Sequence, residues 1–575
     1  MKRFEPYVFL KELASRWDVI AFIVVLGLIA FLGEAGRNLF IPLNQLEVTP
    51  LSLDPSHLPE YAARTTLRMF AALFFSLLFT FTYATWAAKS ERAAKLLVPI
   101  LDILQSVPIL GFISITSVFF LSLAPGRVLG AEFVAIFAIF TSQAWNMAFS
   151  FYQSLRTVPT ELTEAAESFH LSRWMRFWQL EVPFALPALI WNMMLSMSGG
   201  WFFVVASESI TVGQAHVALP GVGSYIALAI MHKNLTAIGW AILTMLIVIL
   251  LYDQLFFRPL VAWVDRFRLE QEPGERIPDS WALTMLRRSR LVKATTMAFH
   301  GAILGMSRIV KKRAQDAAPE LMRVRSSHRT SDLIGIVLIA AACVLGLWHI
   351  AAGVILHTPL REVLHVCGLA FLTMLRVFVL IALASLVWVP IGVWVGMRPR
   401  AARLVQPVAQ FMAAFPADLL FPIAVSAVVE WKLNPDIYLS PLMILGTQWY
   451  ILFNIIAGAS SIPTEMRYAT ANFSIRGWLW WRKVALPAVL PFYVTGAITA
   501  SGGSWNAAQV AELASWGSTE VRARGLGSYI ADAAAAQNFH QLVLGIGVMS
   551  LFVVVLNRIF WRPLYYYAER KYRLT

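Results

Sequence analysis

Two glutamates near the ends of long apolar stretches are the residues of this sequence best placed to do chemistry. Glu208 and Glu512 each follow a run of small residues that ends in a tryptophan. A carboxylate at membrane depth is costly and marks a functional site by default, whereas partial exposure at the outer edge is the alternative. The small residues before each tryptophan could either contact a solute or only allow two helices to pack closely. The sequence therefore predicts a substrate path that includes Ser198, Trp201, Glu208, Ser504, Trp505 and Glu512.

Recognisable catalytic and cofactor motifs are absent from the whole sequence. It contains no G-x-x-x-x-G-K-[ST] phosphate loop, so we expect no ATP hydrolysis by this chain. It has no Ser/His/Asp or metal-spaced cluster, and Cys343 and Cys367 lie in or beside apolar runs without the spacing of a disulfide framework. We predict that the protein is not an enzyme and needs no cofactor or metal.

The composition places these residues in a membrane protein. Of the 575 residues, 58% are hydrophobic and only 14% are charged, whereas soluble domains carry about 25% charged residues. The net charge is +14, and its excess falls in a central stretch and in short loops beside apolar runs. That distribution is typical of cytoplasmic loops that face lipid headgroups, so we expect membrane lipids and no nucleic acid as partners.

Twelve apolar stretches have the length of a membrane-spanning helix. Lys and Arg are concentrated in the N-terminal arm and in the loops after the even-numbered stretches, so both termini are predicted to be cytoplasmic. The predicted spans are 18–33, 67–88, 97–122, 132–152, 187–207 and 237–257 in the first half, and 333–353, 370–396, 405–429, 437–458, 490–510 and 541–560 in the second.

The two halves repeat each other along the chain. Arg68 corresponds to Arg376 with a separation of 308 residues, and the run 221–226 corresponds to 525–530 with a separation of 304. Six spans followed by a cytoplasmic return give parallel repeats, which pack as a pseudo-dimer with a path at their interface. The predicted domains are 1–265, a basic cytoplasmic linker at 266–331, and 332–575.

Two further features affect the number and shape of the spans. An apolar stretch at 294–310 in the linker predicts an interfacial helix on anionic lipid. The alternative, a thirteenth span, would invert the second half against its own basic loops. Pro108 and Pro416 are predicted to kink the third span of each half beside the path.

The segment 158–187, between the fourth and fifth spans, is longer than a simple connection. Pro159 starts one short helix, and Ser172 can cap a second. Pro183 and Pro187 are then expected to break the chain where it enters the membrane. Two short helices with one apolar side fit a groove in another protein, and a hairpin that lies on the membrane is the alternative.

This segment resembles the EAA loop of ABC-importer permeases, the binding-protein-dependent transport inner-membrane components. Glu164-Ala165-Ala166 corresponds to the family's EAA, and the second copy reads Tyr468-Ala469-Thr470. His170 and Ser474 occupy the family's glycine position. The resemblance implies that the ATPase-coupling residues are Glu161, Glu164, Ala165, Ala166, Phe169, His170, Glu465, Tyr468, Ala469, Thr470, Phe473 and Ser474.

The resemblance also implies a fold and a function. The fold is an all-α polytopic membrane protein with two parallel six-helix type I permease repeats. The function is the permease subunit of an ATP-driven importer in the bacterial inner membrane, which works by alternating access. Motifs near the loop and in the fifth spans are most similar to the nitrate/sulfonate/taurine branch, so the solute is expected to be small and anionic. The implied partners are two ABC ATPase subunits and an extracytoplasmic substrate-binding protein. A twelve-helix secondary transporter driven by an ion gradient is the alternative.

Overall fold

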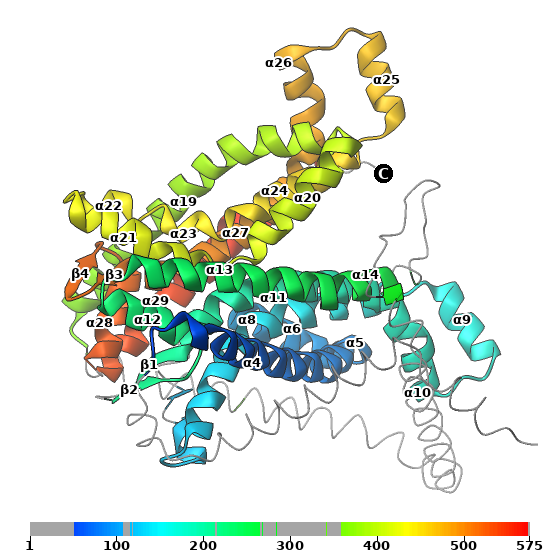
Figure 1. Cartoon of the computed structure of the whole chain (residues 1–575). Helices are drawn as coiled ribbons and strands as arrows, with labels where there is room; N and C mark the ends of the chain where they lie inside the picture. Colours follow the sequence, from blue (N-terminus) through cyan, green and yellow to red (C-terminus); the bar gives the residue numbers. More distant parts are fainter. Residues whose placement is uncertain are drawn as a thin grey trace, which may run out of the picture.

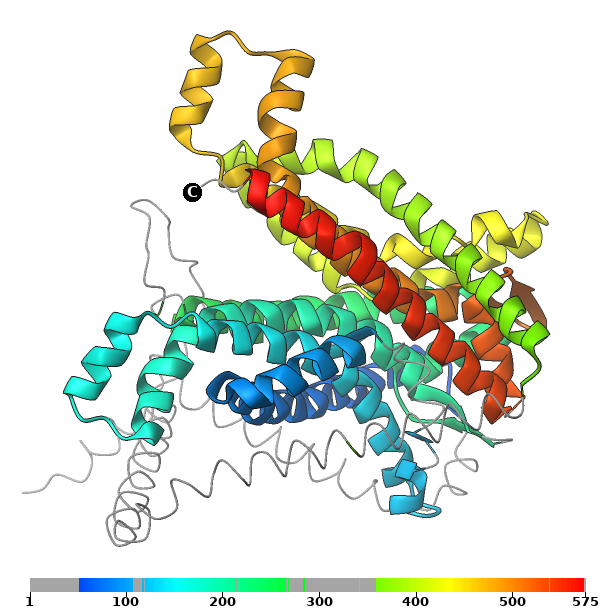
Figure 2. The ribbon, with the colours of Figure 1, turned by 180° about the vertical axis from the view of Figure 1, so that it is seen from behind.

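The computed structural model describes residues 51–106, 116–117, 119–212, 215–264, 267, 283–284, 341, 358–536 and 538–572. Two bundles of long helices, one from each half of the chain, lie against each other (Figures 1 and 2). The predicted span at 18–33, the predicted span at 333–353 apart from residue 341, the linker stretch at 294–310, Pro108 and the predicted domain boundaries lie outside the described residues.

The first half is built from long apolar helices. A helical path begins with α4 (Leu58–Phe79) and continues through a π turn into α5 (Thr85–Lys89). The other long elements are α6 (Glu91–Ser106), α8 (Val128–Arg156), α11 (Val182–Glu208), α13 (Leu235–Tyr252) and α14 (Arg258–Val264).

The second half has the corresponding helices. They are α19 (Leu360–Gly396), α20 (Pro399–Ala414), α21 (Phe421–Glu430), α22 (Pro435–Tyr438), α23 (Leu442–Leu445), α24 (Gln448–Ser460), α27 (Leu486–Ala511), α29 (Phe539–Leu556) and α30 (Arg562–Tyr572).

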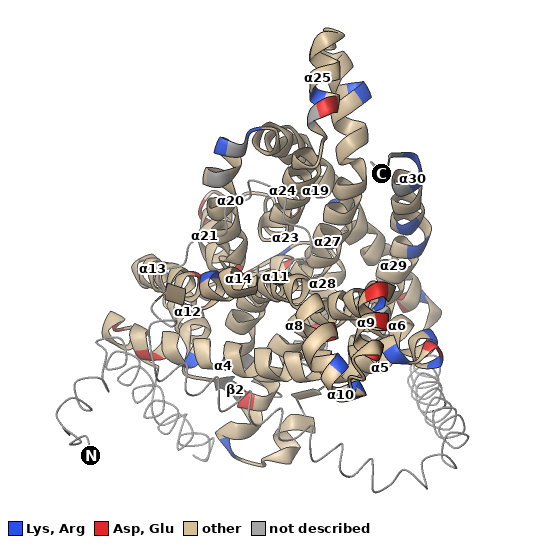
Figure 3. Cartoon of the chain, turned by 90° about the vertical axis from the view of Figure 1, so that its right-hand side faces the viewer, with Lys and Arg blue, Asp and Glu red and all other residues tan. Residues whose placement is uncertain are grey.

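The membrane crossings agree with the sequence pattern. Seven helices in the described part are long and apolar enough to cross a membrane, and two bent helix pairs raise the number to nine. These nine correspond to nine of the twelve predicted spans, while the predicted span 97–122 is helical up to Ser106 and lies partly outside the described residues. The bend of 77° between Ala414 and Ala417 confirms the predicted kink at Pro416. The charged residues gather toward helix ends and loops (Figure 3).

Short elements occupy the two ends of the bundles (Figure 1). At one end are two antiparallel β hairpins and two short helices: β1 (Ser209–Val212) with β2 (Ala215–Ala218), β3 (Leu513–Trp516) with β4 (Thr519–Arg522), α12 (Val222–Met231) and α28 (Leu526–Ala535). Toward the other end two helical hairpins project, α9 (Thr160–Ser168) with α10 (Arg173–Arg176), and α25 (Thr464–Asn472) with α26 (Gly477–Trp480).

A continuous hydrophobic core joins the halves. It includes Trp201 of α11 and Trp505 of α27. Within the halves, α8 packs on α4 and α11, and α24 packs on α19 and α27. Between the halves, α20 contacts α11 and α13, and α29 contacts α6. Large apolar side chains such as Phe74 and Leu386 remain exposed, as expected of helix faces that meet lipid rather than water.

The fifth span of each half differs from the prediction at its prolines. Pro183 and Pro187 do not break the chain, because one helical path runs from Arg173 to Glu208. Pro183 lies in the first turn of α11, directly after a π turn at Phe177–Glu181. The changed hydrogen-bond register of the π turn accommodates the ring of Pro183, and Pro187 lies inside α11. The expected break is therefore wrong.

Candidate functional site

A buried ion cluster connects three helices of the first half. Arg68 of α4 contacts Glu132 of α8 through two bonds, Nε to Oε2 at 2.6 Å and Nη2 to Oε1 at 2.7 Å. Its Nη1 contacts Oε1 of Glu208, at the end of α11, at 2.7 Å. The side chains of Arg68 and Glu208 are 4% and 0% exposed. Each carboxylate thus contacts the one guanidinium, which lowers the high cost of burying these charges, although two carboxylates share a single cation.

The same glutamate accepts a hydrogen bond from the first turn of helix α12. Glu208 Oε2 accepts a hydrogen bond from the Gly223 backbone N–H at 2.7 Å, and Oε1 accepts one from Thr65 Oγ1 at 2.6 Å. A β-carbon on Gly221 would lie 2.3 Å from the Glu208 carboxyl group, so only glycine fits there. A carboxylate suits the positive end of the helix dipole. Glu208 thus connects α12 to the membrane helices α4 and α11 through hydrogen bonds.

The second half carries the equivalent cluster with equivalent residues. Arg376 Nη1 contacts Glu512 Oε1 at 3.1 Å and Nη2 contacts Asp436 Oδ1 at 2.8 Å. Thr373 Oγ1 and the Gly527 N–H donate to Glu512 at 2.8 and 2.7 Å. Asp436 stands 304 residues after Glu132, the separation that also relates Glu512 to Glu208. Asp436 has a side chain 37% exposed, so this copy is the more open one.

The sequence pattern did not identify the partners of the two glutamates. Arg68 and Thr65 lie 140 and 143 positions before Glu208, and nothing in the local sequence connects them. The available signal was the repeat itself, because Thr65, Arg68, Glu132, Glu208 and Gly223 all have matching partners in the second half.

A cavity of about 250 Å³ lies between the halves, lined by residues of α8, α11, α23, α27 and the bend after α20. Of the predicted substrate-path residues, Ser198 lines it, and Ser198 Oγ donates to the carbonyl of Ala413 in the other half. Ser504 Oγ lies 3.0 Å from Oγ1 of Thr447, a lining residue.

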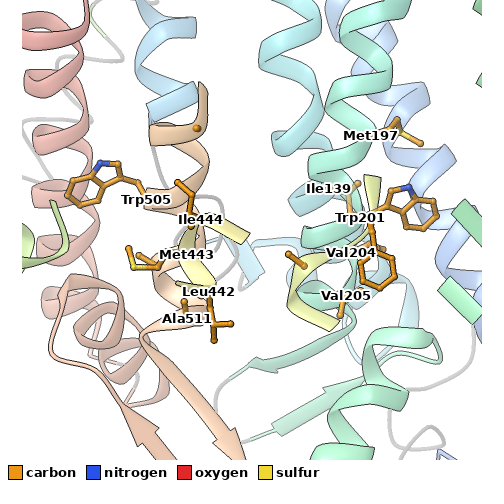
Figure 4. Close-up of a cluster of buried hydrophobic side chains, with 14 of the residues drawn as sticks. Ile139, Met197, Trp201, Val204, Val205, Leu442, Met443, Ile444, Trp505 and Ala511 are labelled. Carbon is orange, nitrogen blue, oxygen red and sulfur yellow. The ribbon is translucent and has the colours of Figure 1, made fainter. Parts of the chain in front are cut away.

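The other predicted path residues lie in the protein core rather than on the cavity. Trp201 is 0% exposed and Trp505 is 2% exposed. Figure 4 shows Trp201 beside Met197 and Ile139, with Trp505 in the other half. Neither tryptophan, nor Ser504, Glu208 or Glu512, is among the described residues that line the cavity. Their direct contact with a solute stays a prediction.

Each projecting hairpin contains a turn that normally favours glycine. His170 has a φ of +50° and Ser474 a φ of +52°. After α9, the N–H groups of His170 and Leu171 donate to Glu167 and Ala166 at 2.9 and 3.0 Å. After α25, the N–H groups of Ser474 and Ile475 make the corresponding bonds to Ala471 and Thr470 at 3.0 and 2.9 Å. This is the hydrogen-bond pattern of a helix end with a left-handed residue, so the turn exists in both copies despite the missing glycine.

The hairpins present large apolar side chains to their surroundings. Phe169 and Phe473 are both 79% exposed, and Tyr468 is 71% exposed. Ala166 and Thr470 are buried beneath them. The remaining predicted coupling residues Glu161, Glu164, Ala165, His170, Glu465, Ala469 and Ser474 are exposed. Exposed apolar groups of this size at the tip of a projection indicate a protein interaction surface.

Comparisons with known proteins identify relatives among transport permeases. The bicarbonate transport system permease protein CmpB of Synechococcus elongatus is 25% identical over 177 residues, 31% of this chain and 60% of the relative. The nitrate import permease protein NrtB of Synechocystis is 24% identical over 203 residues, 35% of this chain and 70% of the relative. The glycine betaine/proline betaine transport system permease protein ProW of Escherichia coli is 28% identical over 163 residues, 28% of this chain and 43% of the relative. The chain thus spans about 60% of the length of the bicarbonate relative.

The family match covers both halves. The model of the binding-protein-dependent transport system inner membrane component matches residues 80–266 and again residues 388–573. These matches contain both helical hairpins, Glu132, Glu208 and Glu512 of the ion clusters, and all described residues that line the cavity. Because they cover well over half of the chain, the protein belongs to this family and is a fused double permease of the ABC-importer type.

Proposed function

We propose that this chain forms the translocation path of an ATP-driven importer whose ATPase is a separate pair of subunits. The observation that carries the proposal is the pair of projecting helical hairpins, α9–α10 and α25–α26. Each exposes a phenylalanine, Phe169 or Phe473, at the same position of the repeat. Two matching apolar projections fit two matching grooves, which a dimeric motor would supply. The residues predicted for coupling line these projections.

The transport step follows from the arrangement of the two halves. Nucleotide-driven closure of the ATPase pair would move the hairpins and open the interface of the halves alternately toward each side. The cavity of about 250 Å³ at that interface is smaller than the 300–1,000 Å³ of drug-sized pockets, which supports a small solute. We propose that a binding protein delivers the solute at the end with the β hairpins, and that both termini are cytoplasmic.

The solute class comes from the relatives and the sequence together. Relatives are named for bicarbonate, nitrate and glycine betaine, and the sequence motifs predict a nitrate-, sulfonate- or taurine-like anion. We take a small polar solute of this group as the cargo. Sulfonate and taurine differ from nitrate in having an organic part, and taurine also has an ammonium group.

A single substitution in each hairpin tests the coupling role. Ala165→Glu and Ala469→Glu each place a charge at an exposed alanine of a hairpin and should abolish co-purification of the ATPase. Ala536→Glu, at an exposed position in the β-hairpin end, is the matched control and should leave association intact. Membrane insertion of all three variants is measured in parallel. Normal ATPase association of the two hairpin variants would refute the coupling role.

One observation favours the alternative, a secondary transporter driven by an ion gradient. Asp418 is 9% exposed at the bend between α20 and α21, and its Oδ1 has no hydrogen-bond partner. Buried ionisable groups within spans are typical of ion-coupled carriers. The two mechanisms separate in vesicles that contain only this polypeptide, because concentrative uptake without nucleotide would establish the alternative.

A further inference from the structure

A network of ion pairs holds the base of the first hairpin, α9–α10. Lys89 Nζ, at the end of α5, lies 2.9 Å from Glu181 Oε2. Arg176 of α10 contacts Glu181 through Nε at 3.2 Å and Glu167 of α9 through Nη1 at 3.1 Å. Two basic and two acidic side chains therefore balance each other's charge and connect both helices of the hairpin to the end of a membrane-crossing path.

All four positions of this network are apolar in the second half. With the separations that relate the two halves, Lys89 corresponds to Met397, and the other three positions correspond in chain order to Ala471, Trp480 and Ala485. Met397, Ala471 and Trp480 line a cavity of about 260 Å³ at the base of the second hairpin, α25–α26. An apolar cavity therefore replaces the ion pairs.

Two arginines in the lining of this cavity lack a carboxylate partner. Arg467 and Arg476 both line it, and neither forms an ion pair within the part of the chain that the structure describes. Arg467 Nη2 donates to the Ala459 carbonyl at 3.3 Å, but its Nε is buried without a hydrogen-bond partner. A buried donor left unsatisfied is costly, so an acceptor from an anionic ligand would stabilise the cavity.

The two hairpin segments carry opposite net charge. Segment 158–187 has four acidic and two basic residues, a net charge of −2. Segment 462–491 has one acidic and four basic residues, a net charge of +3. The arginines of the cavity correspond to the uncharged Thr163 and Ser172 in the first half. Only the second hairpin therefore combines an apolar cavity with an excess of positive charge.

The cavity lies where three membrane helices begin or end. Met397 directly follows α19, Ile462 is the second residue after α24, and Val484 lies in the π turn that leads into α27. The ends of membrane-crossing helices reach the headgroup region of the bilayer. Trp478 of α26 is 74% exposed, and tryptophan is enriched at that level. Phospholipid headgroups are therefore the surroundings of this cavity.

We propose that the cavity binds the phosphate group of an acidic phospholipid. Arg467 and Arg476 hold the phosphate through charge-assisted hydrogen bonds, while Met397 and Trp480 contact the first part of an acyl chain. Basic pockets between membrane helices bind acidic headgroups in this way. A zwitterionic headgroup is a poorer ligand, because its ammonium group would lie in an excess of positive charge. The lipid thus brings to the second half the negative charge that glutamates supply in the first.

Lipid binding to the full-length chain in detergent tests the proposal. Phosphatidylglycerol and phosphatidylcholine with the same acyl chains are titrated separately, and native mass spectrometry counts the bound molecules. One phosphatidylglycerol should bind saturably and more tightly than any phosphatidylcholine. Equal binding of the two lipids would overturn the proposal.

Arginine variants locate the site. The double variant Arg467→Gln with Arg476→Gln should weaken phosphatidylglycerol binding about tenfold or more. Arg173→Gln is the matched control, because Arg173 is an exposed arginine of the first hairpin, and it should leave binding unchanged. Unchanged binding in the double variant, or equal weakening by Arg173→Gln, would overturn the site.

A substitution at Ala471 separates charge from volume. Ala471→Glu introduces the carboxylate that Glu167 provides at the same position of the first half. It should abolish phosphatidylglycerol binding, because the new carboxylate neutralises the arginines. Ala471→Gln has almost the same shape without the charge and should weaken binding less. Equal losses in the two variants would show that volume alone decides, and would overturn the assignment of a charged headgroup.

Two further measurements distinguish the lipid from other occupants. Inorganic phosphate and glycerol 3-phosphate should not displace bound phosphatidylglycerol, whereas displacement by either would indicate a site for a soluble anion. ATPase co-purification of the double arginine variant is measured in nanodiscs of phosphatidylcholine alone, and association should be normal. Loss of association with unchanged lipid binding would assign the cavity to the ATPase instead.

Discussion

The ion clusters of the two halves should contribute unequally to stability, and Glu208→Gln against Glu512→Gln measures the difference. Glutamine retains one acceptor oxygen but turns an NH₂ group toward the donors of Arg68, Thr65 or Gly223. Removing one partner of a buried ion pair costs about 3–5 kcal/mol. We expect Glu208→Gln to fall in this range, because Arg68 is 4% exposed and water cannot replace the lost contact.

The second cluster is closer to solvent. The Arg376 and Asp436 side chains are 11% and 37% exposed, so water can solvate the group that Glu512→Gln leaves unpaired. We expect a loss of about 1.5–3 kcal/mol, the value for a hydrogen bond to a charged group. The free energy of unfolding should therefore fall by about 2 kcal/mol more in Glu208→Gln than in Glu512→Gln.

Denaturant unfolding of the nanodisc-embedded chain, followed by tryptophan fluorescence, gives the free energies. Glu520→Gln is the control, since Glu520 and Arg522 form an exposed pair at 2.7 Å whose side chains are 58% and 53% exposed. Such pairs contribute little, so no measurable loss is expected there. Equal losses for Glu208→Gln and Glu512→Gln, or losses no larger than the control, would refute the reasoning from burial.

The membrane spans could be predicted from the sequence because each is an apolar run of sufficient length, which is a local property. The helical hairpins could be predicted for the same reason, since Pro159 and Ser172 mark helix starts within a few residues. The two hairpin turns at His170 and Ser474 adopt a left-handed backbone that their residue types disfavour. Backbone hydrogen bonds that local sequence patterns do not reveal compensate for it there.

The site could be predicted only in part, because its contacts join distant helices. Glu208 was recognised as an unusual carboxylate, but its pairing with Arg68 requires α4 and α11 to be placed side by side. Ser198 was expected on the path and lines the cavity. The lining contribution of α8 and of the bend near Phe415 depends on how the halves meet, which periodicity does not encode.

Two further expectations concern backbone positions with positive φ. His170→Gly and Ser474→Gly should each stabilise their hairpin by about 1 kcal/mol, because a left-handed conformation costs other residues about 1–2 kcal/mol; slower amide hydrogen exchange in the hairpin checks this. Gly517→Ala should separate the halves at the β-hairpin end. Gly517 N–H donates to the Ile230 carbonyl of the first half at 3.0 Å, and a β-carbon there would lie 2.1 Å from Lys233 Cε. Gly126 also has a positive φ, +67°, but open space around it, so Gly126→Ala introduces backbone strain without that clash. Faster amide exchange at the end of α12 in Gly517→Ala, but not in Gly126→Ala, is expected. Unchanged exchange in Gly517→Ala would show that this turn does not hold the two halves together.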